Sequence, residues 1–322
     1  MIAYPGARPD PLPLRERLLS NLVQAPLFGL ATILFGTLSL LASLFDRDGR
    51  AQHAIARTWA ALTLRISRCP VAIIGGENLT RYPVALYAAN HASYMDTPVI
   101  FSSLPTRFRI LAKHELWKVP FIGWHLRRSG QIPINAENAR ASVASLNIGV
   151  RALKAGMPLF IFPEGGRSES GDLAPFMNGA SYIAVRAGVP IVPLALVGTY
   201  ELLPIHTRAF HPRPLLLVAG EPIVTDGYTS KNLDELTCRL RSAIAELFYS
   251  HSGRPRPELR ADEVEADDAR GADDARPATA SRPVLSRQEL PAVHADSECP
   301  AKGEMAPGPL RVSRSNYNGR QR

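Results

Sequence analysis

The stretch AGMPLFIFPEGGRS, residues 155–168, places a helix end, a strand and a tight turn next to one another. A glycine and a proline within positions 156–158 end a helical segment, because glycine favours the left-handed cap and proline cannot extend a helix. The apolar run Leu159–Phe162 then predicts a short buried strand. The two glycines after Glu164 let the backbone bend sharply, and Arg167 projects from the bend. A helix followed at once by a strand and a turn is typical of an α/β fold.

The same alternation of strands and helices continues from about Val71 to Tyr249. A second glycine–proline pair, at positions 188–190, again separates a helix from a strand. The pattern predicts an α/β domain with a mixed, largely parallel sheet flanked by helices. The predicted strands are Val71–Ile74, Val84–Ala88, Phe108–Ala112, Leu159–Phe162, Ile191–Val197 and Leu215–Ala219, and the predicted helices are Glu137–Ala155, Asn178–Ala187 and Leu233–Phe248.

An apolar run without any charged residue, Leu22–Phe45, precedes this domain. Its roughly 24 residues are enough to cross a hydrocarbon core of about 30 Å. Arginines flank the run on both sides, so the distribution of positive charge does not set an orientation. Pro26 and two glycines permit a bend, so a helix lying in the membrane plane competes with a full span. A buried helix of a soluble domain is a further alternative, although such a helix normally has a polar stripe.

The next segment, about residues 48–66, has apolar residues at helical spacing with arginines and a histidine between them. This pattern is typical of an amphipathic helix on a membrane surface, with Trp59 at the level of the lipid head groups. A helix that packs on the core of a soluble domain has the same spacing. Because the segment adjoins an uncharged run, the membrane interpretation is favoured, and residues 1–66 are predicted to anchor the protein to a membrane.

Charge and composition divide the rest of the chain. Residues 251–322 carry twelve basic and twelve acidic side chains and few large apolar ones, which predicts a disordered tail. Residues 67–250 are predicted to form the α/β domain. The net charge of +8 therefore belongs to the body of the protein, which suits an anionic partner such as nucleic acid, a phosphate ester or an acidic membrane surface. The three cysteines are scattered, so neither a metal site nor a disulfide framework is predicted. Their small number predicts a reducing compartment.

The stretch ANHASYMDTP, residues 89–98, follows a predicted strand that delivers His91 to its carboxyl end, where α/β folds bind their ligands. Asp96 follows five residues later. If a helix begins at about His91, the Asp96 carboxylate can reach an imidazole nitrogen, fix the tautomer and stabilise the imidazolium. The pair then forms a general base. A structural histidine is the common alternative for such a pair, and Asp96 before Thr97-Pro98 could equally cap a helix.

A serine nucleophile is not predicted. The sequence around Ser168 misses the G-x-S-x-G pattern, because Ser170 stands where the last glycine would be. Ser93 lies too close to His91 in the chain for the geometry of a catalytic triad. Without a nucleophile of the protein's own, the base is expected to activate a hydroxyl of the substrate.

Four blocks of the sequence together resemble the PlsC-like 1-acylglycerol-3-phosphate acyltransferases, in the order and spacing of that family. The resemblance covers about residues 60–220. The blocks are Asn90-His91-x4-Asp96, AKHELWKVPFIGWHLRRSGQIPI at 112–134, FPEGGRS at 162–168 and VPIVPLAL at 189–196. The last of these is expected to be a core strand.

The resemblance implies an enzyme of phospholipid synthesis that needs no metal and no cofactor. His91 with Asp96 would remove the proton from the free hydroxyl of the lyso-phospholipid acceptor, and the donor would be acyl-CoA or acyl carrier protein. The turn after Phe162 would bind the acceptor's phosphate. Arg167 would be the main ligand, because a guanidinium grips two phosphate oxygens, with Glu164 and Gly165 shaping the turn and Lys113 as a second cation. An ion pair between Glu164 and Arg167 on the surface is the alternative.

By the same resemblance, the protein is expected on the inner or cytoplasmic membrane, with its active site facing the cytoplasm and with no nucleic acid as partner. Two departures from the family pattern bear on the acceptor. Gly166 stands where the family commonly has threonine, and Asn135 and Ala136 replace a charged pair. Another lyso-lipid, such as a lyso-aminolipid, is the first alternative acceptor. A membrane-tethered hydrolase and a lipid-binding protein without catalysis are the alternatives outside acyl transfer.

Overall fold

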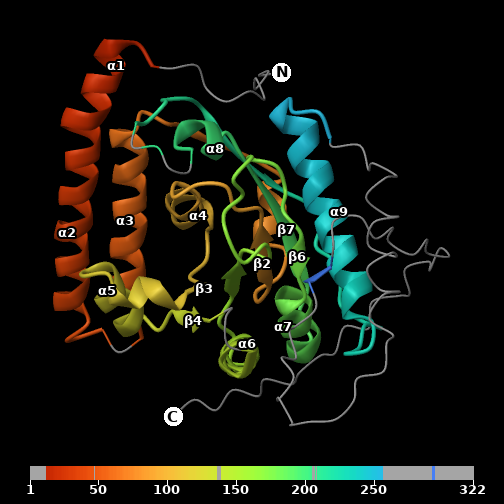
Figure 1. Ribbon diagram of the computed structural model, residues 1–322. Helices are drawn as coiled ribbons and strands as arrows, with labels where there is room; N and C mark the ends of the chain where they lie inside the picture. The colour runs from red at the N-terminus through yellow and green to blue at the C-terminus, as the bar shows by residue number, and fades with distance from the viewer. Residues whose placement is uncertain are drawn as a thin grey trace, which may run out of the picture.

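The computed structural model describes residues 12–46, 48–135, 139–204, 207, 209–256 and 292–293. A seven-stranded sheet lies at the centre of these residues, with helices on both of its faces (Figure 1). The strands, in their order across the sheet, are β1 (Val71–Ile74), β8 (Leu215–Ala219), β7 (Ile191–Val197), β2 (Leu86–Ala89), β5 (Leu159–Ile161), β3 (Arg109–Lys113) and β4 (Ile132–Ile134).

The sheet is mixed and largely parallel, as the sequence predicts. The five strands from β7 to β4 run parallel to one another, whereas β8 is antiparallel to β7 and β1 is parallel to β8. Ala88 of β2 is level with Ile161 of β5. The loops that follow these two strands therefore leave the sheet at the same edge.

Two hydrophobic cores form on the two faces of the sheet, because side chains alternate along each strand. Leu86 and Ala88 of β2 belong to one core, and Tyr87 and Ala89 belong to the other. The first core is covered by α6 (Ala139–Lys154), α7 (Gly179–Ala187) and α9 (Leu233–Ser252), and the second by α3 (Arg50–Ile66) and α4 (Asp96–Ser103).

A long helix lies outside α3 as an additional layer (Figure 1). It consists of α1 (Leu14–Leu19), a π-helical turn (Ser20–Gln24) and α2 (Ala25–Ala42). The π-helical turn lies directly before Pro26, which has no N–H to donate to the preceding turn. Of the described helices, Leu14–Ala42 is the one that is long and apolar enough to cross a membrane.

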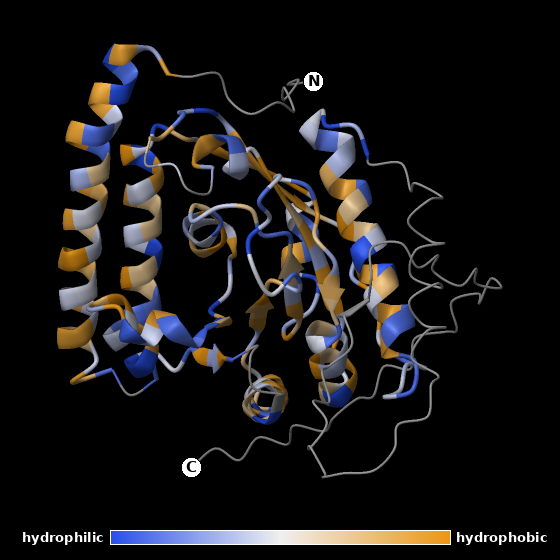
Figure 2. Ribbon diagram, viewed as in Figure 1, coloured by the Kyte–Doolittle hydropathy of each residue, from blue (hydrophilic) through white to orange (hydrophobic). Residues whose placement is uncertain are grey.

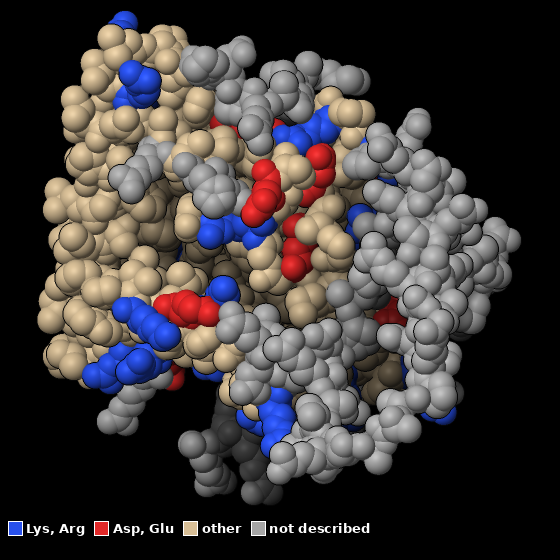
Figure 3. Space-filling view, viewed as in Figure 1, with Lys and Arg blue, Asp and Glu red and all other residues tan. Residues whose placement is uncertain are grey.

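The outer side of this long helix is apolar and exposed. It appears as orange bands on α2 in Figure 2 and as a tan surface along the left of the molecule in Figure 3. Its exposed apolar side chains are Leu14, Leu18, Leu22, Val23, Leu27, Leu30, Ile33, Leu34, Leu38, Leu41, Leu44 and Phe45.

The amphipathic segment predicted at 48–66 is α3, but its contacts differ from those of a surface helix. Ala56, Ala60 and Leu64 are buried in the core beside α4. Trp59, predicted to lie among lipid head groups, donates its indole N–H to Thr32 of α2 at 3.2 Å. The core-packing alternative therefore describes α3, and the exposed apolar face belongs to α2.

Short elements complete the described chain. They are two 3₁₀ turns (Gly76–Leu79 and His114–Lys118), α5 (Ile122–Arg128), α8 (Thr199–Leu202) and the antiparallel pair of β6 (Phe176–Met177) and β9 (Ala292–Val293). Three of the predicted strands, in β1, β7 and β8, match to the residue. The sequence pattern did not predict β4 or α5, because these elements are three and seven residues long and show too few periods of a hydrophobic repeat.

The domain boundary predicted at residue 250 falls too early. α9 continues to Ser252, and Arg254 beyond it is buried. Its guanidinium donates to Glu201 at 2.8 Å and to the backbone oxygen of Ser170 at 3.1 Å. The folded body therefore includes Arg254. Beyond residue 256, the predicted tail lies outside the described residues, apart from Ala292–Val293.

Candidate functional site

The loop that follows β2 is joined to β7 by a side chain. Asn90 is buried, accepts from the Leu196 N–H at 2.7 Å and donates to the Leu196 carbonyl at 3.0 Å. An amide side chain thus continues the pairing beyond the last residue of β2. As a result, His91 leaves the sheet from a fixed position at its carboxyl edge.

His91 and Asp96 form the predicted pair. Nδ1 of His91 lies 2.7 Å from Oδ2 of Asp96. The same oxygen accepts the backbone N–H groups of Ala92 and Ser93, each at 2.8 Å. Asp96 is completely buried, and these three donors fix its carboxylate.

The helix expected to begin at about His91 begins at Asp96 instead. The segment before Asp96 is a turn, closed by the Asp96 carboxylate on the amides of Ala92 and Ser93. The predicted contact therefore arises from a side chain that closes a loop, and not from two neighbouring faces of a helix. Asp96 does not cap α4, whose N-cap has no side-chain hydrogen bond.

Phe162 stacks on His91, with the ring centroids 3.8 Å apart and the planes 12° from parallel. Asp96 and Phe162 together fix the orientation of the imidazole. About a fifth of the His91 side chain is exposed, and no hydrogen bond to Nε2 is made within the described part of the chain. The pair therefore presents a basic nitrogen at the surface, with Nδ1 held by a carboxylate.

Glu164 links the turn after β5 to the histidine loop. Its carboxyl accepts the His91 N–H at 3.0 Å and the Ala174 N–H at 3.3 Å. Burial raises the pKa of Glu164 to about 8, and the nearby Asp96 charge adds to the rise, although the two amides lower it. Near pH 7 this carboxyl is mostly neutral, so it does not repel a phosphate.

Arg167 lies on the face of Tyr94, with its guanidinium carbon 3.6 Å from the ring centroid. Its Nη1 is buried and has no hydrogen-bond partner. No carboxylate of the described residues lies within ion-pair distance of Arg167. The predicted alternative, a surface ion pair with Glu164, is therefore not formed.

The two glycines of this turn have different environments. Gly165 has φ +70°, and a Cβ there would lie 2.8 Å from the sulfur of Met177. A side chain at Gly166 would meet no atom within 4 Å. Gly165 is therefore required by the backbone, whereas Gly166 leaves open space beside Arg167.

Lys113 ends β3 and is well exposed, and its Nζ lies 3.7 Å from Glu115. The strand register puts the end of β3 at the same sheet edge as the turn after β5. In the departure that follows β4, at Asn135 and Ala136, the backbone oxygen of Asn135 accepts the Ser142 hydroxyl. Ala136 lies outside the described residues.

The two serines near the pair are bonded to the backbone. Ser168 is buried, and its hydroxyl oxygen accepts the Gly171 N–H at 3.1 Å. The Ser93 hydroxyl donates to the Leu203 carbonyl at 3.0 Å. Neither hydroxyl is bonded to His91, so neither is placed as a nucleophile.

Sequence reasoning named the pair and the turn but not the residues that join them. Phe162 and Tyr94 stand inside the quoted motifs, and an aromatic residue next to a candidate base or cation could have been noted as a stacking partner. No local signal identifies Glu164 as the acceptor of the His91 N–H, because the two residues are 73 positions apart.

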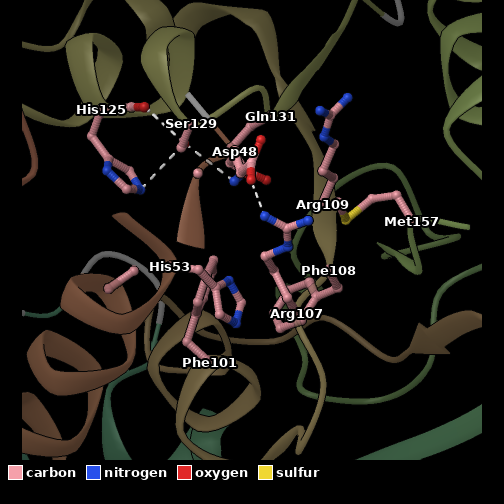
Figure 4. A pocket seen from close by; sticks show the side chains of 12 residues that line it. Asp48, His53, Phe101, Arg107, Phe108, Arg109, His125, Ser129, Gln131 and Met157 are labelled. Carbon is pink, nitrogen blue, oxygen red and sulfur yellow. Dashed lines mark hydrogen bonds between the residues drawn. The ribbon is translucent and has the colours of Figure 1, made fainter. Parts of the chain in front are cut away.

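A separate pocket lies at the amino ends of β3 and β5 (Figure 4). His53 and His125 line it together with Arg107 and Arg109, and it contains none of the predicted site residues. Burial lowers the pKa of both histidines to about 4, so they are neutral near pH 7. Nδ1 of His125 lies 2.6 Å from the Ser39 hydroxyl. The pocket therefore lies at the junction where α5 is bonded to α2.

Comparisons with known proteins identify the family of this chain. The acyltransferase family model matches residues 70–197. A 1-acyl-sn-glycerol-3-phosphate acyltransferase of Chlamydomonas reinhardtii is 33% identical over 265 residues, which are 79% of this chain and 77% of the relative. A chloroplastic enzyme of the same name from Brassica napus is 36% identical over 206 residues, which are 63% of this chain but only 58% of the relative's length.

The fold is also that of a solved acyltransferase. The crystal structure of the 1-acyl-sn-glycerophosphate acyltransferase PlsC from Thermotoga maritima superposes with a TM-score of 0.63 and 25% sequence identity. The match covers 76% of this chain and 99% of that chain. The order of the four sequence blocks, the paired His91 and Asp96 at the sheet edge and these similarities lead to one conclusion: the chain belongs to the 1-acyl-sn-glycerol-3-phosphate acyltransferase family.

Proposed function

We propose that this chain transfers a fatty acyl group from acyl-CoA or acyl carrier protein to the free hydroxyl of 1-acylglycerol-3-phosphate, which produces phosphatidate. The main support is the His91–Asp96 pair, at 2.7 Å, beside a turn that carries an unpaired arginine. A base and a cation at one edge of the sheet suit an acceptor that has both a hydroxyl and a phosphate.

In the proposed reaction, Nε2 of His91 takes the proton of the acceptor hydroxyl as its oxygen attacks the thioester carbonyl carbon. The new C–O bond gives a tetrahedral intermediate, and its collapse breaks the C–S bond. The thiolate leaves and recovers a proton from the imidazolium. Asp96 stabilises that imidazolium through Nδ1 and does not itself accept the proton. No acyl-enzyme is needed.

The acceptor's phosphate would bind at Arg167. A guanidinium offers five N–H donors in a planar fork, which matches phosphate oxygens. Glu164 is neutral near pH 7 and leaves the field of Arg167 uncompensated. Lys113 is exposed and is the second cation that we assign to this edge of the sheet.

We further propose that α2 lies in the plane of one membrane leaflet. Polar side chains on the inner side of α2 and of the π-helical turn before it bond to the domain, from Ser20 with the Phe210 N–H at 2.7 Å to Ser39 with His125. These positions are roughly 28 Å apart at 1.5 Å per residue. If α2 crossed the bilayer, α3 would enter the hydrocarbon with it, including Arg57 and Arg65, at a high cost for charged groups.

An in-plane helix keeps the domain in water and its outer apolar side in lipid. Lys and Arg side chains gather over α5 at the lower end of the apolar face in Figure 3 and suit the phosphate layer of a membrane. We place the active site on the cytoplasmic side. Cys69 and Cys238 are buried as thiols and not joined in disulfides, which fits a reducing compartment.

An acyltransfer assay on membranes with a panel of labelled lyso-lipid acceptors tests this function. Phosphatidate formation that depends on both lysophosphatidate and a thioester supports the proposal, and a His91→Ala protein supplies the blank. Acylation of a lyso-aminolipid in preference to lysophosphatidate would identify the lyso-aminolipid as the acceptor. Release of free fatty acid without any acceptor would instead identify a hydrolase.

A further inference from the structure

The contact between Arg167 and Tyr94 joins the two loops of the site. Tyr94 lies in the turn between His91 and Asp96, and Arg167 lies in the turn after β5. The guanidinium carbon is 3.6 Å from the ring centroid, which is the distance of direct stacking. The Tyr94 side chain is 58% exposed, so the ring is a platform at the surface and not part of the core.

The ring holds the arginine without using its hydrogen-bond donors. A carboxylate partner would neutralise the guanidinium and accept its N–H groups, whereas an aromatic face attracts the charge from above the plane. Within the described residues Arg167 has no carboxylate partner, and its Nη1 has no hydrogen-bond partner at all. A buried donor without a partner lowers stability in the free protein and gains an interaction when an anion binds.

The same turn also carries the base. The Asp96 carboxylate closes this turn on the amides of Ala92 and Ser93, so Tyr94 has a backbone that is fixed relative to His91. A cation resting on Tyr94 is thereby held at a set position from the imidazole. An acceptor with its phosphate on Arg167 would have its hydroxyl held at a defined position relative to Nε2 of His91.

We propose that Tyr94 is a positioning residue that keeps Arg167 in place, and unneutralised, for the phosphate of the acceptor. The inference builds on the proposed function and adds a residue to it. It requires that Tyr94 act on acceptor binding, that it act through Arg167, and that the aromatic ring and not the hydroxyl be the active part.

The test uses the full chain in detergent micelles, with lysophosphatidate and an acyl thioester varied separately. Tyr94→Phe keeps the ring and is expected to match the wild type. Tyr94→Leu is expected to raise the KM for lysophosphatidate about two- to fivefold, which corresponds to the free energy of a cation–π contact at an exposed site. Tyr94→Glu, which supplies a carboxylate to Arg167, is expected to raise it further. The KM for the thioester is expected to stay unchanged in all three.

A double-mutant cycle separates positioning from a general structural effect. In an Arg167→Ala background, Tyr94→Leu is expected to cause no further rise in the KM for lysophosphatidate. An equal rise in both backgrounds would overturn the inference, and so would an unchanged KM in Tyr94→Leu alone.

The outcomes also separate this inference from the proposed function. An enzyme that makes phosphatidate but is insensitive to Tyr94→Leu refutes the role of Tyr94 alone. A wild-type protein that acylates only acceptors without a phosphate refutes both, because Arg167 would then have no phosphate to bind.

Discussion

The loop after β2 and the turn after β5 meet at one sheet edge, and they differ in how their charged groups are held, by hydrogen bonds for Asp96 and by an aromatic ring for Arg167. Asp96 is completely buried, and its Oδ2 accepts three hydrogen bonds, whereas its Oδ1 has no partner among the described residues. Arg167 rests on a ring, with one nitrogen unpartnered. A general base must be oriented before the substrate arrives, whereas a cation that binds substrate works best when no protein anion competes for it.

The largest effect on activity is expected from substitutions in the His91–Asp96 pair. His91→Ala is expected to reduce kcat by about 10²–10⁴-fold, the usual contribution of general-base catalysis. Asp96→Asn is expected to lose much of the activity as well, because the imidazolium loses its counter-charge. Initial rates of phosphatidate formation check this, with circular dichroism to show that the variants fold. His251→Ala, at the end of α9, is the matched histidine control, and near-normal turnover of His91→Ala would disprove the mechanism.

The second prediction contrasts two arginines. Arg254 is buried and donates to Glu201 and to the loop at Ser170, whereas Nη1 of Arg167 has no acceptor among the described residues. Arg254→Ala leaves the Glu201 charge buried with its principal partner removed, and is expected to reduce the free energy of unfolding by about 3–5 kcal/mol. A chain truncated after Ser252 is expected to be destabilised likewise, and one truncated after Arg256 is not. Urea unfolding of the three proteins in detergent measures this, and equal midpoints would show that the folded body ends at α9.

The third prediction concerns Arg167 itself. Arg167→Ala is expected to raise the KM for lysophosphatidate about tenfold to a hundredfold, from the loss of a charge-assisted contact of about 1.5–3 kcal/mol. Stability is expected to change little, in contrast to Arg254→Ala. Arg167→Lys is expected to recover part of the affinity, because an ammonium lacks the planar fork. A rise in the KM for the thioester instead would assign the turn to the phosphates of coenzyme A.

The fourth prediction uses pH. The pKa of Glu164 is raised in the folded protein to about 8, above its ordinary value near 4.5. Protonation of Glu164 therefore contributes stability that is fully present below about pH 4.5 and is lost as the pH rises through about 8. Unfolding midpoints at pH 6 and pH 9 are expected to differ, and the difference is expected to shrink in Glu164→Gln. An unchanged difference in this variant would exclude Glu164 as its source.

The smallest effect is expected at Gly166. Gly166→Thr is expected to change the free energy of unfolding by no more than about 0.5 kcal/mol, since a Cβ there meets no atom within 4 Å. Gly165→Thr is the matched variant and is expected to be clearly destabilising, because of its φ of +70° and the close sulfur of Met177. Thermal unfolding compares the two. Equal destabilisation would show that the turn does not have this backbone conformation.

The sequence alone was enough for features whose partners lie close together in the chain. Strands such as Ile191–Val197 follow from a continuous apolar run. The contact of His91 with Asp96 was predicted from residues five apart on a helix, and it forms across a turn instead, at 2.7 Å. The start of α4 was misplaced because the Asp96 carboxylate accepts the N–H groups of Ala92 and Ser93 and so closes a turn before the helix. A hydrophobic periodicity does not indicate such a turn.

The tertiary structure decided everything that joins distant segments. Glu164 meets the His91 N–H, Arg167 meets Tyr94, and Arg254 meets Glu201 only because the strand order brings β2 beside β5 and packs α9 against β7. Trp59 donates its indole N–H to Thr32 of α2 for the same reason. A hydrophobic pattern specifies that a residue is buried, but its partner depends on which elements become neighbours, and this is set by packing over the whole sheet.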